Sequence, residues 1–256
     1  VIATIIVVVA LWIAMSYWTL TDTRRSQRIL WDATRGIRRL TVDRFSSQQA
    51  AKKPWTEKDI SKFHWVNTRT PSREESPEYQ ELAANDFADF RLEVGGMVSA
   101  PASFSLAELK AISSQSQITM HTCMQGWTGI AKWTGIRVRD LLAQVGQIDP
   151  EAGWVMFESF GMAQHMHDGR PVEPYYTCLP LDMALEDDTI LAWGRNDAPL
   201  SGMFGAPLRL RCETSHGYKM IKWVRSVTLI RHYSEVGDGM GGTREDSGYQ
   251  DVNARI

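Results

Sequence analysis

The sequence predicts an α+β domain that is mainly β, preceded by one transmembrane helix. From residue 63 onward, short apolar runs with strand character outnumber the amphipathic helical segments. No long strand–helix–strand spacing occurs, which argues against a parallel α/β sheet. Residues 1–21 carry no charged side chain, and about 20 apolar residues are enough to span the hydrocarbon core of a bilayer.

Residues 1–21 are interpreted as a membrane span and not as a signal peptide. No basic region precedes the apolar run, and no small-residue cleavage site follows it. Residues 22–45 contain seven arginines and three aspartates, so the positive-inside rule places this side in the cytoplasm. Apolar residues recur at helical spacing among the arginines, which predicts a basic amphipathic helix on lipid headgroups near Arg24 to Arg44 or on a membrane partner. A solvated charged spacer is the alternative.

The remaining chain divides into a linker over residues 46–62 and a domain over residues 63–256 with an irregular C-terminal tail. The polar, irregular composition continues to about residue 81 and predicts an extended arm. Ser105 and Glu108 form a capping-box pattern, which predicts a helix that runs to about Ile112. Further short helices are expected over 137–143 and 181–185. Strands are expected over 90–98, 118–124, 155–160, 189–193, 208–212 and 224–231.

The composition excludes several classes of function. A net charge of −2 argues against a nucleic-acid binder, which usually carries a basic excess. Three scattered cysteines and no C-x-x-C pattern argue against a disulfide framework, a zinc ribbon or a covalent c-type haem. His165 and His167 lack the i,i+4 spacing and the carboxylate partner of a zincin, which argues against a metal site there.

Cys123 is the first candidate for chemistry. It follows a β-rich run and precedes two tryptophans, Trp127 and Trp133, and three glycines. A thiol at the end of a strand suits a metal ligand or a nucleophile, and an ordinary buried cysteine is the plainer alternative. A nucleophilic role would require a base, and the sequence positions none evidently.

A basic turn over residues 206–222 is the second candidate. Arg209 leaves a strand, His216 and Gly217 form a turn, and Lys219 and Lys222 follow. Fixed positive charge, a forked guanidinium and the N–H groups of a glycine turn together suit a phosphate or pyrophosphate. Taken alone, the same pattern also fits a solvated basic hairpin.

Five segments follow one another along the predicted domain: FRLEVGGMVSAPASFSLAEL, HTCMQGWTGIAKWTGIRVRDLL, WVMFESF, LDMALEDDTILAWGRNDAPL and GAPLRLRCETSHGYKMIKWVRSVTLI. In this order they resemble the sulfite-oxidase-type molybdopterin domain, near the bacterial branch of methionine-sulfoxide-reducing molybdoenzymes. The resemblance covers residues 63–249. It implies a sulfite-oxidase-type molybdopterin-binding fold with a molybdenum–molybdopterin cofactor.

The resemblance assigns a role to both candidates. It implies that the thiolate of Cys123 is the protein ligand of molybdenum, a role for which a soft donor is suited. It implies that Arg209 contacts the phosphate of the cofactor. The residues expected to bind the cofactor, by resemblance or by the charge of the basic turn, are Asn67, Ser159, Arg209, Lys219, Met220, Ile221 and Lys222.

Several positions depart from the family pattern and leave the substrate open. Phe204 stands where an Asn or His commonly contacts the pterin, and Gln125 replaces an acidic residue. Thr70 and Pro71 stand where the methionine-sulfoxide-reducing members carry a Tyr-Glu pair.

Two functions are therefore expected. The first is a membrane-anchored molybdenum-pterin oxidoreductase that transfers an oxygen atom and exchanges electrons with a membrane-embedded redox protein. The second is an accessory subunit that keeps the fold within a larger membrane complex, with or without the cofactor. The predicted location is the bacterial inner membrane. The charge rule favours the cytoplasmic face for the domain, and the family's habit favours the periplasm.

Overall fold

The computed structural model describes residues 2–21, 26, 29, 33, 37, 54–163 and 173–249. The chain divides into two compact units, Val1–Gln48 and Gln49–Ile256, and each is described by itself. Most of the predicted interfacial helix over 22–45, residues 46–53 of the linker predicted over 46–62, and both His165 and His167 lie outside the described residues.

The first unit contains helix α1, Ile2–Thr21, which coincides with the predicted helical segment. It carries no charged side chain, and its last hydroxyl, Oγ1 of Thr21, donates to the carbonyl oxygen of Tyr17 over 2.9 Å. Among the helices of the described residues, none has both the length and the apolar character needed to cross a membrane, so the transmembrane span is not supported.

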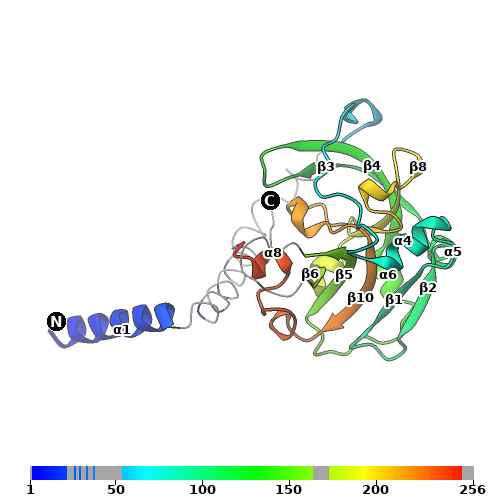
Figure 1. Ribbon diagram of the computed structural model, residues 1–256. Helices are drawn as coiled ribbons and strands as arrows, with labels where there is room; N and C mark the ends of the chain where they lie inside the picture. Colours follow the sequence, from blue (N-terminus) through cyan, green and yellow to red (C-terminus); the bar gives the residue numbers. More distant parts are fainter. Residues whose placement is uncertain are drawn as a thin grey trace. The chain divides into compact units, whose positions relative to one another are not determined.

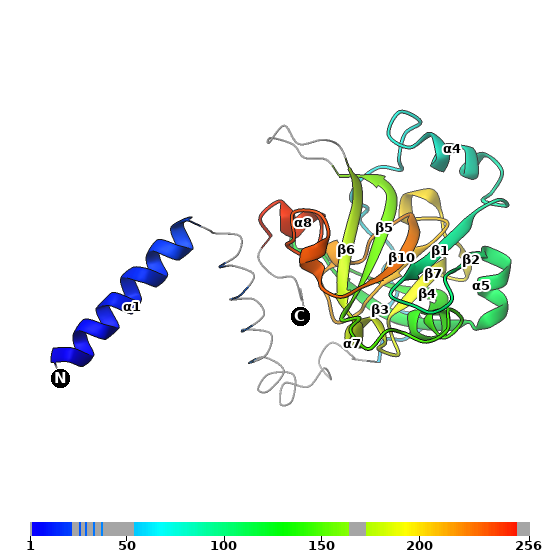
Figure 2. The ribbon, with the colours of Figure 1, turned by 90° about the horizontal axis from the view of Figure 1, so that it is seen from below.

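Among the described residues, the second unit contains two five-stranded sheets. The first sheet has the order β2-β1-β10-β5-β6, in which β1 and β10 are parallel and the other neighbours antiparallel. Figures 1 and 2 show β5, β10 and β1 side by side. Its strands are β1 Arg91–Gly96, β2 Ala102–Ser105, β5 Trp154–Met162, β6 Pro174–Pro180 and β10 Val224–Ile230.

The second sheet is antiparallel throughout. Its order is β3-β4-β7-β8, and β9 pairs with the other part of β7. This sheet carries both predicted clusters, because Cys123 follows β3 and Arg209 begins β9. Its strands are β3 Gln115–Thr122, β4 Thr128–Arg137, β7 Ile190–Arg195, β8 Ala198–Pro199 and β9 Arg209–Arg211.

Short helices connect and cover the strands. The predicted capping box is confirmed, since Glu108 N donates to Ser105 Oγ over 3.2 Å and Ser105 N donates to Glu108 Oε2 over 2.7 Å. The α-helices of the second unit are α4 Pro77–Ala84, α5 Leu106–Ile112, α6 Val138–Leu142, α7 Leu181–Ala184 and α8 Thr243–Asp246. The 3-10 helices are η1 Glu57–Asp59, η2 Gly202–Phe204, η3 Gly217–Lys219 and η4 Tyr233–Glu235.

The mainly β class is confirmed, and each predicted strand has a counterpart in the structure. The main apolar core includes alternate residues of β1, Leu92 and Val94, together with Phe157 of β5 and Val227 of β10. The prediction of an irregular arm up to residue 81 was wrong at its end, because α4 begins at Pro77 with Ser76 as its N-cap.

Candidate functional site

The connection between β3 and β4 holds Cys123 in a fixed position. Cys123 N donates to the carbonyl oxygen of Trp127 over 2.9 Å, and Gly126 N donates to the carbonyl oxygen of Cys123 over 3.0 Å. Gly126 has a φ of +88°, a conformation that glycine adopts without steric cost. Asn67 Nδ2 lies 3.4 Å from Cys123 Sγ and donates to it. The thiol is buried and belongs to no disulfide.

Cys123 lies in the wall of a cavity of about 1200 Å³, counting its open mouth. Residues from the N-terminal arm, from the β3–β4 turn and from the basic turn share this cavity. It therefore joins the two clusters that the sequence analysis singled out. The predicted site residues that line it are Asn67, Cys123, Ser159, Arg209, Met220, Ile221 and Lys222.

Lys222 ties the N-terminal arm to the basic turn. Its Nζ donates to the carbonyl oxygens of Asn67 over 2.7 Å, of Thr68 over 3.1 Å and of Met203 over 3.1 Å. Burial, and then the positive charge of Arg209, lowers the pKa of Lys222 to about 7. The side chain thus holds Asn67 where its amide reaches the thiol.

Ser159 supports the backbone of the basic turn. Its Oγ donates to the carbonyl oxygen of Lys222 over 2.7 Å and accepts from Gly161 N over 2.8 Å. The single hydroxyl proton is therefore already used within the protein, although the residue lines the cavity. Its contribution in this structure is to fix the end of β5 against the turn.

Arg209 is a buried cation with few partners. The side chain is only 7% exposed, and its one hydrogen bond to a described residue runs from Nη1 to the carbonyl oxygen of Phe204 over 3.2 Å. Its Nε is buried without a hydrogen-bond partner in the described part of the chain. Burial, followed by the charge of Arg211, lowers the pKa of Arg209 to about 9. A buried guanidinium with an unused donor is suited to bind an anion.

Lys219 does not line the cavity, so the structure does not support the prediction that it binds the cofactor. Its side chain is fully buried and forms an ion pair with Glu245 of α8. Its Nζ also donates to the carbonyl oxygens of Cys178 over 3.1 Å and of Gly241 over 3.2 Å. Lys219 ends the 3-10 turn η3, where its side chain leaves the turn toward β6 and the C-terminal segment.

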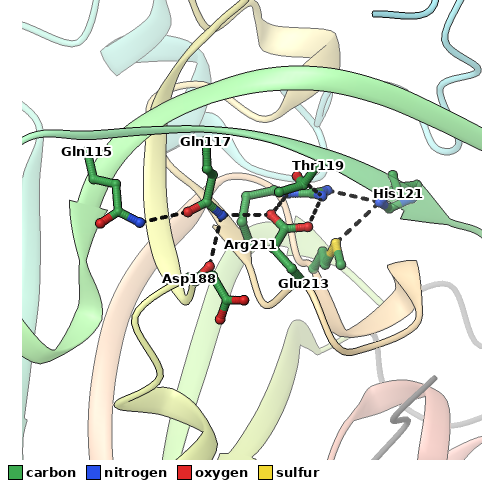
Figure 3. A network of polar contacts seen from close by, with 8 residues as sticks. Gln115, Gln117, Thr119, His121, Asp188, Arg211 and Glu213 are labelled. Carbon is green, nitrogen blue, oxygen red and sulfur yellow. Dashed lines mark hydrogen bonds and ion pairs between the residues drawn. The ribbon is translucent and has the colours of Figure 1, made fainter. Parts of the chain in front are cut away.

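His121 is a cavity residue that the sequence analysis did not assign to the site. It lies two residues before Cys123 in chain order, and both line the same cavity. Arg211 Nη1 lies 3.0 Å from His121 Nδ1, as Figure 3 shows. Because a guanidinium only donates, Nδ1 accepts and the imidazole is neutral. Burial, and then the charges of Arg209 and Arg211, holds the pKa of His121 far below its usual value.

This arrangement bears on the alternative of a thiol enzyme without a metal. The Nδ1 lone pair of His121 is occupied by Arg211, and the Nε2 side of the ring faces Gly217, where an added Cβ would lie 2.3 Å away. Within the described residues no hydrogen bond joins His121 to Cys123. The general base that such chemistry requires is therefore not provided by this histidine.

Further cavity residues come from segments that carried no motif. Tyr175 lies in β6, Arg244 in α8 and Tyr249 after it, and all three line the cavity. The guanidinium carbon of Arg244 lies 5.8 Å from each of the two tyrosine ring centroids. No motif in the sequence indicates this group, because long-range packing of the C-terminal segment brings it to the site.

Two departures from the family pattern have a visible place. Gln125 Oε1 accepts from Trp127 Nε1 over 3.3 Å and lies 4.0 Å from Cys123 Sγ, so it remains beside the thiol. The ring of Phe204 lies outside the cavity lining and stacks under Arg195, whose guanidinium carbon is 4.0 Å from the ring centroid. In the described ranges, no group of three or more His, Cys, Asp or Glu residues is placed to hold a metal ion.

The thiol of Cys123 and the guanidinium of Arg209, whose Nε has no partner among the described residues, line the same cavity. Such a site suits a ligand that carries an anionic group and also binds a soft sulfur donor. Residues 79–236 match the family described as the oxidoreductase molybdopterin binding domain. The chain belongs to this family of molybdopterin-binding oxidoreductases.

Two curated relatives show the extent of the similarity. The chain is 33% identical over 169 residues to the putative protein-methionine-sulfoxide reductase subunit YedZ1 of Azospira oryzae, which covers 66% of this chain and 57% of the relative. It is 32% identical over 148 residues to the protein-methionine-sulfoxide reductase catalytic subunit MsrP of Xanthomonas axonopodis pv. citri. This match covers 56% of this chain and 46% of the relative. The chain thus spans about half the length of these relatives.

Among solved structures, the sulfane dehydrogenase SoxCD of Paracoccus pantotrophus is similar with a TM-score of 0.48 and 23% identity. The match covers 56% of this chain and 39% of that one.

The family's cofactor is a molybdenum–molybdopterin, and the residues present fit it. Cys123 would supply the soft donor that the metal requires. The unpaired Nε of Arg209 and the cationic turn supply donors for a phosphate. Asn67, Met220, Ile221 and Lys222 line the same cavity as Cys123 and Arg209.

Proposed function

We propose that this chain is a molybdenum–molybdopterin oxidoreductase that transfers an oxygen atom. The observation that carries the proposal is that Cys123 and the basic turn line one cavity although more than 80 residues separate them in the sequence. When bound, the cofactor supplies a two-electron redox centre that accepts or donates the oxygen atom.

The chain's own residues would divide the remaining work. The thiolate of Cys123 binds the metal, and the amide of Asn67 stabilises the sulfur's charge by donating a hydrogen bond to it. Lys222 donates hydrogen bonds to three carbonyl oxygens, two of them in the arm that carries Asn67, and thereby holds this arm at the site. Arg209 binds the phosphate at the other end and thereby orients the group.

A sulfoxide is the substrate class that we propose, and reduction is the direction. The sulfoxide would take up two electrons and two protons and yield a thioether and water. The names of the two relatives, both described as methionine-sulfoxide reductase subunits, support this choice. So does the cavity mouth, where Trp65 and Met124 are 59% and 48% exposed, because sulfur and aromatic groups make favourable contacts with a thioether.

Elemental analysis of the purified full chain tests the proposal. We expect molybdenum and pterin near one per chain from cells that load a control molybdoenzyme, and reduction of methionine sulfoxide by a reduced dye. We expect Cys123→Ser to abolish both the molybdenum content and the activity. Absence of molybdenum from the wild-type chain, under conditions in which the control is loaded, would refute it.

An accessory subunit is the second candidate, and the departures at Thr70 and Pro71 favour it. In that case the domain would assemble into a membrane complex whether or not the cofactor is bound. Mild detergent extraction distinguishes the two functions. An accessory subunit should migrate with a larger complex, and Cys123→Ser should leave that complex intact.

We also propose that the chain works at the bacterial inner membrane and exchanges electrons with a membrane-embedded redox protein. The seven arginines of residues 22–45 support this location, because such a segment is attracted to anionic headgroups. The positive-inside rule favours the cytoplasmic face. Protease treatment of intact spheroplasts tests the side. A domain on the periplasmic face would be digested, and a domain on the cytoplasmic face would be protected.

A further inference from the structure

The C-terminal segment contributes a second charged group to the cavity, separate from the residues assigned to the cofactor. Helix α8 lies against β6, where Thr177 pairs with Gly242 directly before the helix (Figures 1 and 2). This packing brings residues of β6, of η3, of α8 and of the segment after α8 into contact in the cavity lining. We call these four residues the C-terminal wall: Tyr175, Tyr218, Arg244 and Tyr249.

Aromatic rings frame the half-buried guanidinium of Arg244. Its central carbon lies 5.8 Å from the ring centroids of both Tyr175 and Tyr249. The rings of Tyr218 and Tyr249 meet edge to face, with centroids 5.4 Å apart. Tyr175 Oη donates to the carbonyl oxygen of Tyr218 over 3.2 Å, which ties β6 to η3. The wall therefore holds its cation within a fixed aromatic frame.

The C-terminal wall adjoins the segment that carries Cys123. Gly217 directly precedes Tyr218 and packs against the end of β3. A Cβ at Gly217 would lie 2.3 Å from His121 Nε2 and 3.3 Å from the carbonyl oxygen of Thr122. Cys123 is the next residue after Thr122, and Gly217, His121 and Cys123 all line the cavity. A substrate that reacts beside the thiol therefore has the C-terminal wall as a neighbour.

No carboxylate balances the charge of Arg244 within the described residues. Its two acidic neighbours in α8 are engaged elsewhere, since Glu245 forms the buried ion pair with Lys219. Asp246 accepts from Tyr176 Oη over 2.5 Å and from two backbone N–H groups. Because Arg244 is half-buried, solvent screens its charge less than that of a surface arginine. This cation can therefore attract an anion from the cavity.

The cavity as a whole has an excess of positive charge among its described lining residues. Glu75 is a lining carboxylate, and it is already paired with Arg69 over 3.1 Å. Lys222 donates to three carbonyl oxygens, and Arg209 is assigned to the phosphate of the cofactor. Arg244 is thus the described cation of this cavity that has neither a carboxylate partner nor an assigned role.

The arginines of the second sheet do not compete for this role. The guanidinium carbons of Arg195, Arg209 and Arg211 lie 5.8, 5.2 and 4.5 Å from the ring centroid of Trp133, which is fully buried. Of these three, Arg209 lines the cavity, and the other two lie outside the lining. Arg211 is in addition paired with Glu213.

A carboxylate is the anion that the C-terminal wall fits best. A guanidinium presents two parallel N–H donors, which match the two oxygens of a carboxylate. The rings of Tyr218 and Tyr249, together with Met162, lie in the same lining. Aromatic rings and sulfur make favourable contacts with a thioether. The wall therefore suits a ligand that joins a carboxylate to a short sulfur-bearing chain.

We propose that Arg244 binds the carboxylate of the substrate and thereby makes the enzyme selective for anionic sulfoxides, in which the carboxylate lies a few bonds from the sulfur. That the bound molecule is a sulfoxide rests on the proposed function, whereas the binding of a carboxylate by Arg244 does not. The carboxylate itself stays unchanged. The sulfoxide takes up two electrons from the cofactor and two protons, and yields a thioether and water.

The first experiment measures binding without turnover. The full chain is titrated by calorimetry with methylthiopropionate, a thioether acid, and with its neutral amide. We expect the wild-type chain to bind the acid about tenfold more tightly than the amide, because the amide cannot form the charge-assisted pair. Arg244→Gln should remove this preference and leave the affinity for the amide unchanged. Arg231→Gln, at a 61% exposed side chain, is the matched control and should keep the preference.

Equal affinity of the wild-type chain for acid and amide, or a preference for the acid that persists in Arg244→Gln, would overturn the proposal. Arg244→Lys separates charge from packing, because lysine keeps the charge without the planar fork. We expect it to retain part of the preference. If Arg244→Gln also weakens binding of the amide, the lysine variant decides: a preference for the acid in Arg244→Lys supports the proposal, and its absence overturns it.

The second experiment uses chains loaded with the cofactor and compares kcat/KM for methylsulfinylpropionate and its amide. We expect the wild type to prefer the acid about tenfold. Arg244→Gln should lose this preference through a higher KM for the acid. Equal values for acid and amide in the wild type would overturn the inference and leave the proposed function standing. A chain that binds the thioether acid through Arg244 yet reduces no sulfoxide would refute the proposed function and leave the carboxylate site standing.

Two peptides identify the source of the carboxylate. Each has blocked ends and a methionine sulfoxide that is followed by either an aspartate or an asparagine. A preference for the aspartyl peptide that Arg244→Gln abolishes assigns the site to acidic segments of oxidised proteins. Equal rates for the two peptides, with the preference for the small acid intact, assign it to free sulfoxide acids. A preference in neither pair overturns the proposal.

Discussion

The buried ion pair between Lys219 and Glu245 gives the sharpest prediction of stability. Both side chains are fully buried, and the pair joins the 3-10 turn η3 to helix α8. Two further bonds run from Lys219 Nζ to the carbonyl oxygens of Cys178 and Gly241. The pair thus connects two walls of the cavity, since Met220 beside Lys219 and Arg244 beside Glu245 both line it.

Lys219→Met should be strongly destabilising. It leaves the carboxylate of Glu245 buried without its counter-charge, and breaking a buried pair in this way costs about 3–5 kcal/mol. With a urea dependence of about 2–3 kcal/mol per molar, this corresponds to a midpoint lower by about 1–2 M. The double variant Lys219→Met/Glu245→Leu removes both charges and should recover most of the loss.

The loss should also depend on pH. Burial raises the pKa of Glu245 above its ordinary value, and Lys219 opposes this shift. Without the lysine the pKa rises further. When the folded pKa of a carboxyl lies above its unfolded pKa, the protonated form favours folding. The free-energy penalty of burying the charged form therefore grows as pH rises from the unfolded pKa through the folded pKa. The deficit of Lys219→Met should therefore be largest near pH 8 and shrink toward pH 5.

Urea unfolding followed by tryptophan fluorescence at pH 5, 6.5 and 8 measures these effects. The exposed pair of Arg231 and Glu151 offers a control, because Arg231→Met removes only a solvent-screened ion pair and should leave the urea midpoint close to that of the wild type. The reasoning is refuted if Lys219→Met unfolds like the wild type, or if its deficit is the same at all three pH values.

Three further predictions concern the cavity itself. Cys123→Ser should remove bound molybdenum, measured by elemental analysis, yet change the free energy of unfolding by only about 1 kcal/mol, because the hydrogen bond that Asn67 donates to the sulfur is weak. Gly217→Ala should lower the urea midpoint, since its Cβ would lie 2.3 Å from His121 Nε2, whereas Gly95→Ala has a nearest contact of 3.7 Å and should be neutral. The folded pKa of Lys222 is depressed to about 7, so the free energy of unfolding should rise between about pH 7 and pH 10. Lys222→Met should flatten this rise, and an unchanged pH profile in the variant would contradict the prediction.

Local patterns sufficed to predict much of the fold. The capping box at Ser105 and the short apolar strands are decided by neighbouring residues, and they appear where expected. Strand β4 was missed because its glycines suggested a loop. In the structure Gly135 is needed for a close approach to β7, since a Cβ there would lie 2.2 Å from the carbonyl oxygen of Leu191. Helix α4 carried a usable signal in Ser76 and Pro77, an N-cap followed by proline at the first helical position.

The candidate site was predictable where charge and position in the chain agree. Cys123 and Arg209 could be named because each follows or begins a recognisable strand and carries distinctive chemistry. Lys219 carried the same charge as Lys222 and lay only three residues away, yet it turned into the interior toward Glu245. The sequence alone does not indicate which of the two lysines pairs with a buried carboxylate 26 residues farther along the chain.

Arg195 shows why periodicity alone fails to assign a residue of β7 to one face of the sheet. Its place in the apolar run of β7 predicts that it faces away from Ala192, and a solvent-facing arginine would need no partner. In the pairing of β4 with β7, the neighbouring residues Thr134 and Gly135 meet Gly194 and Ala192, so β7 has one extra residue at this point. The extra residue, Trp193, reverses that assignment. A bulge of this kind changes no composition, charge or motif, yet it decides which face of the sheet carries the cation. The face of the sheet that collects Arg195, Arg209 and Arg211 is therefore a property of strand register, and register is set by partners distant in the sequence.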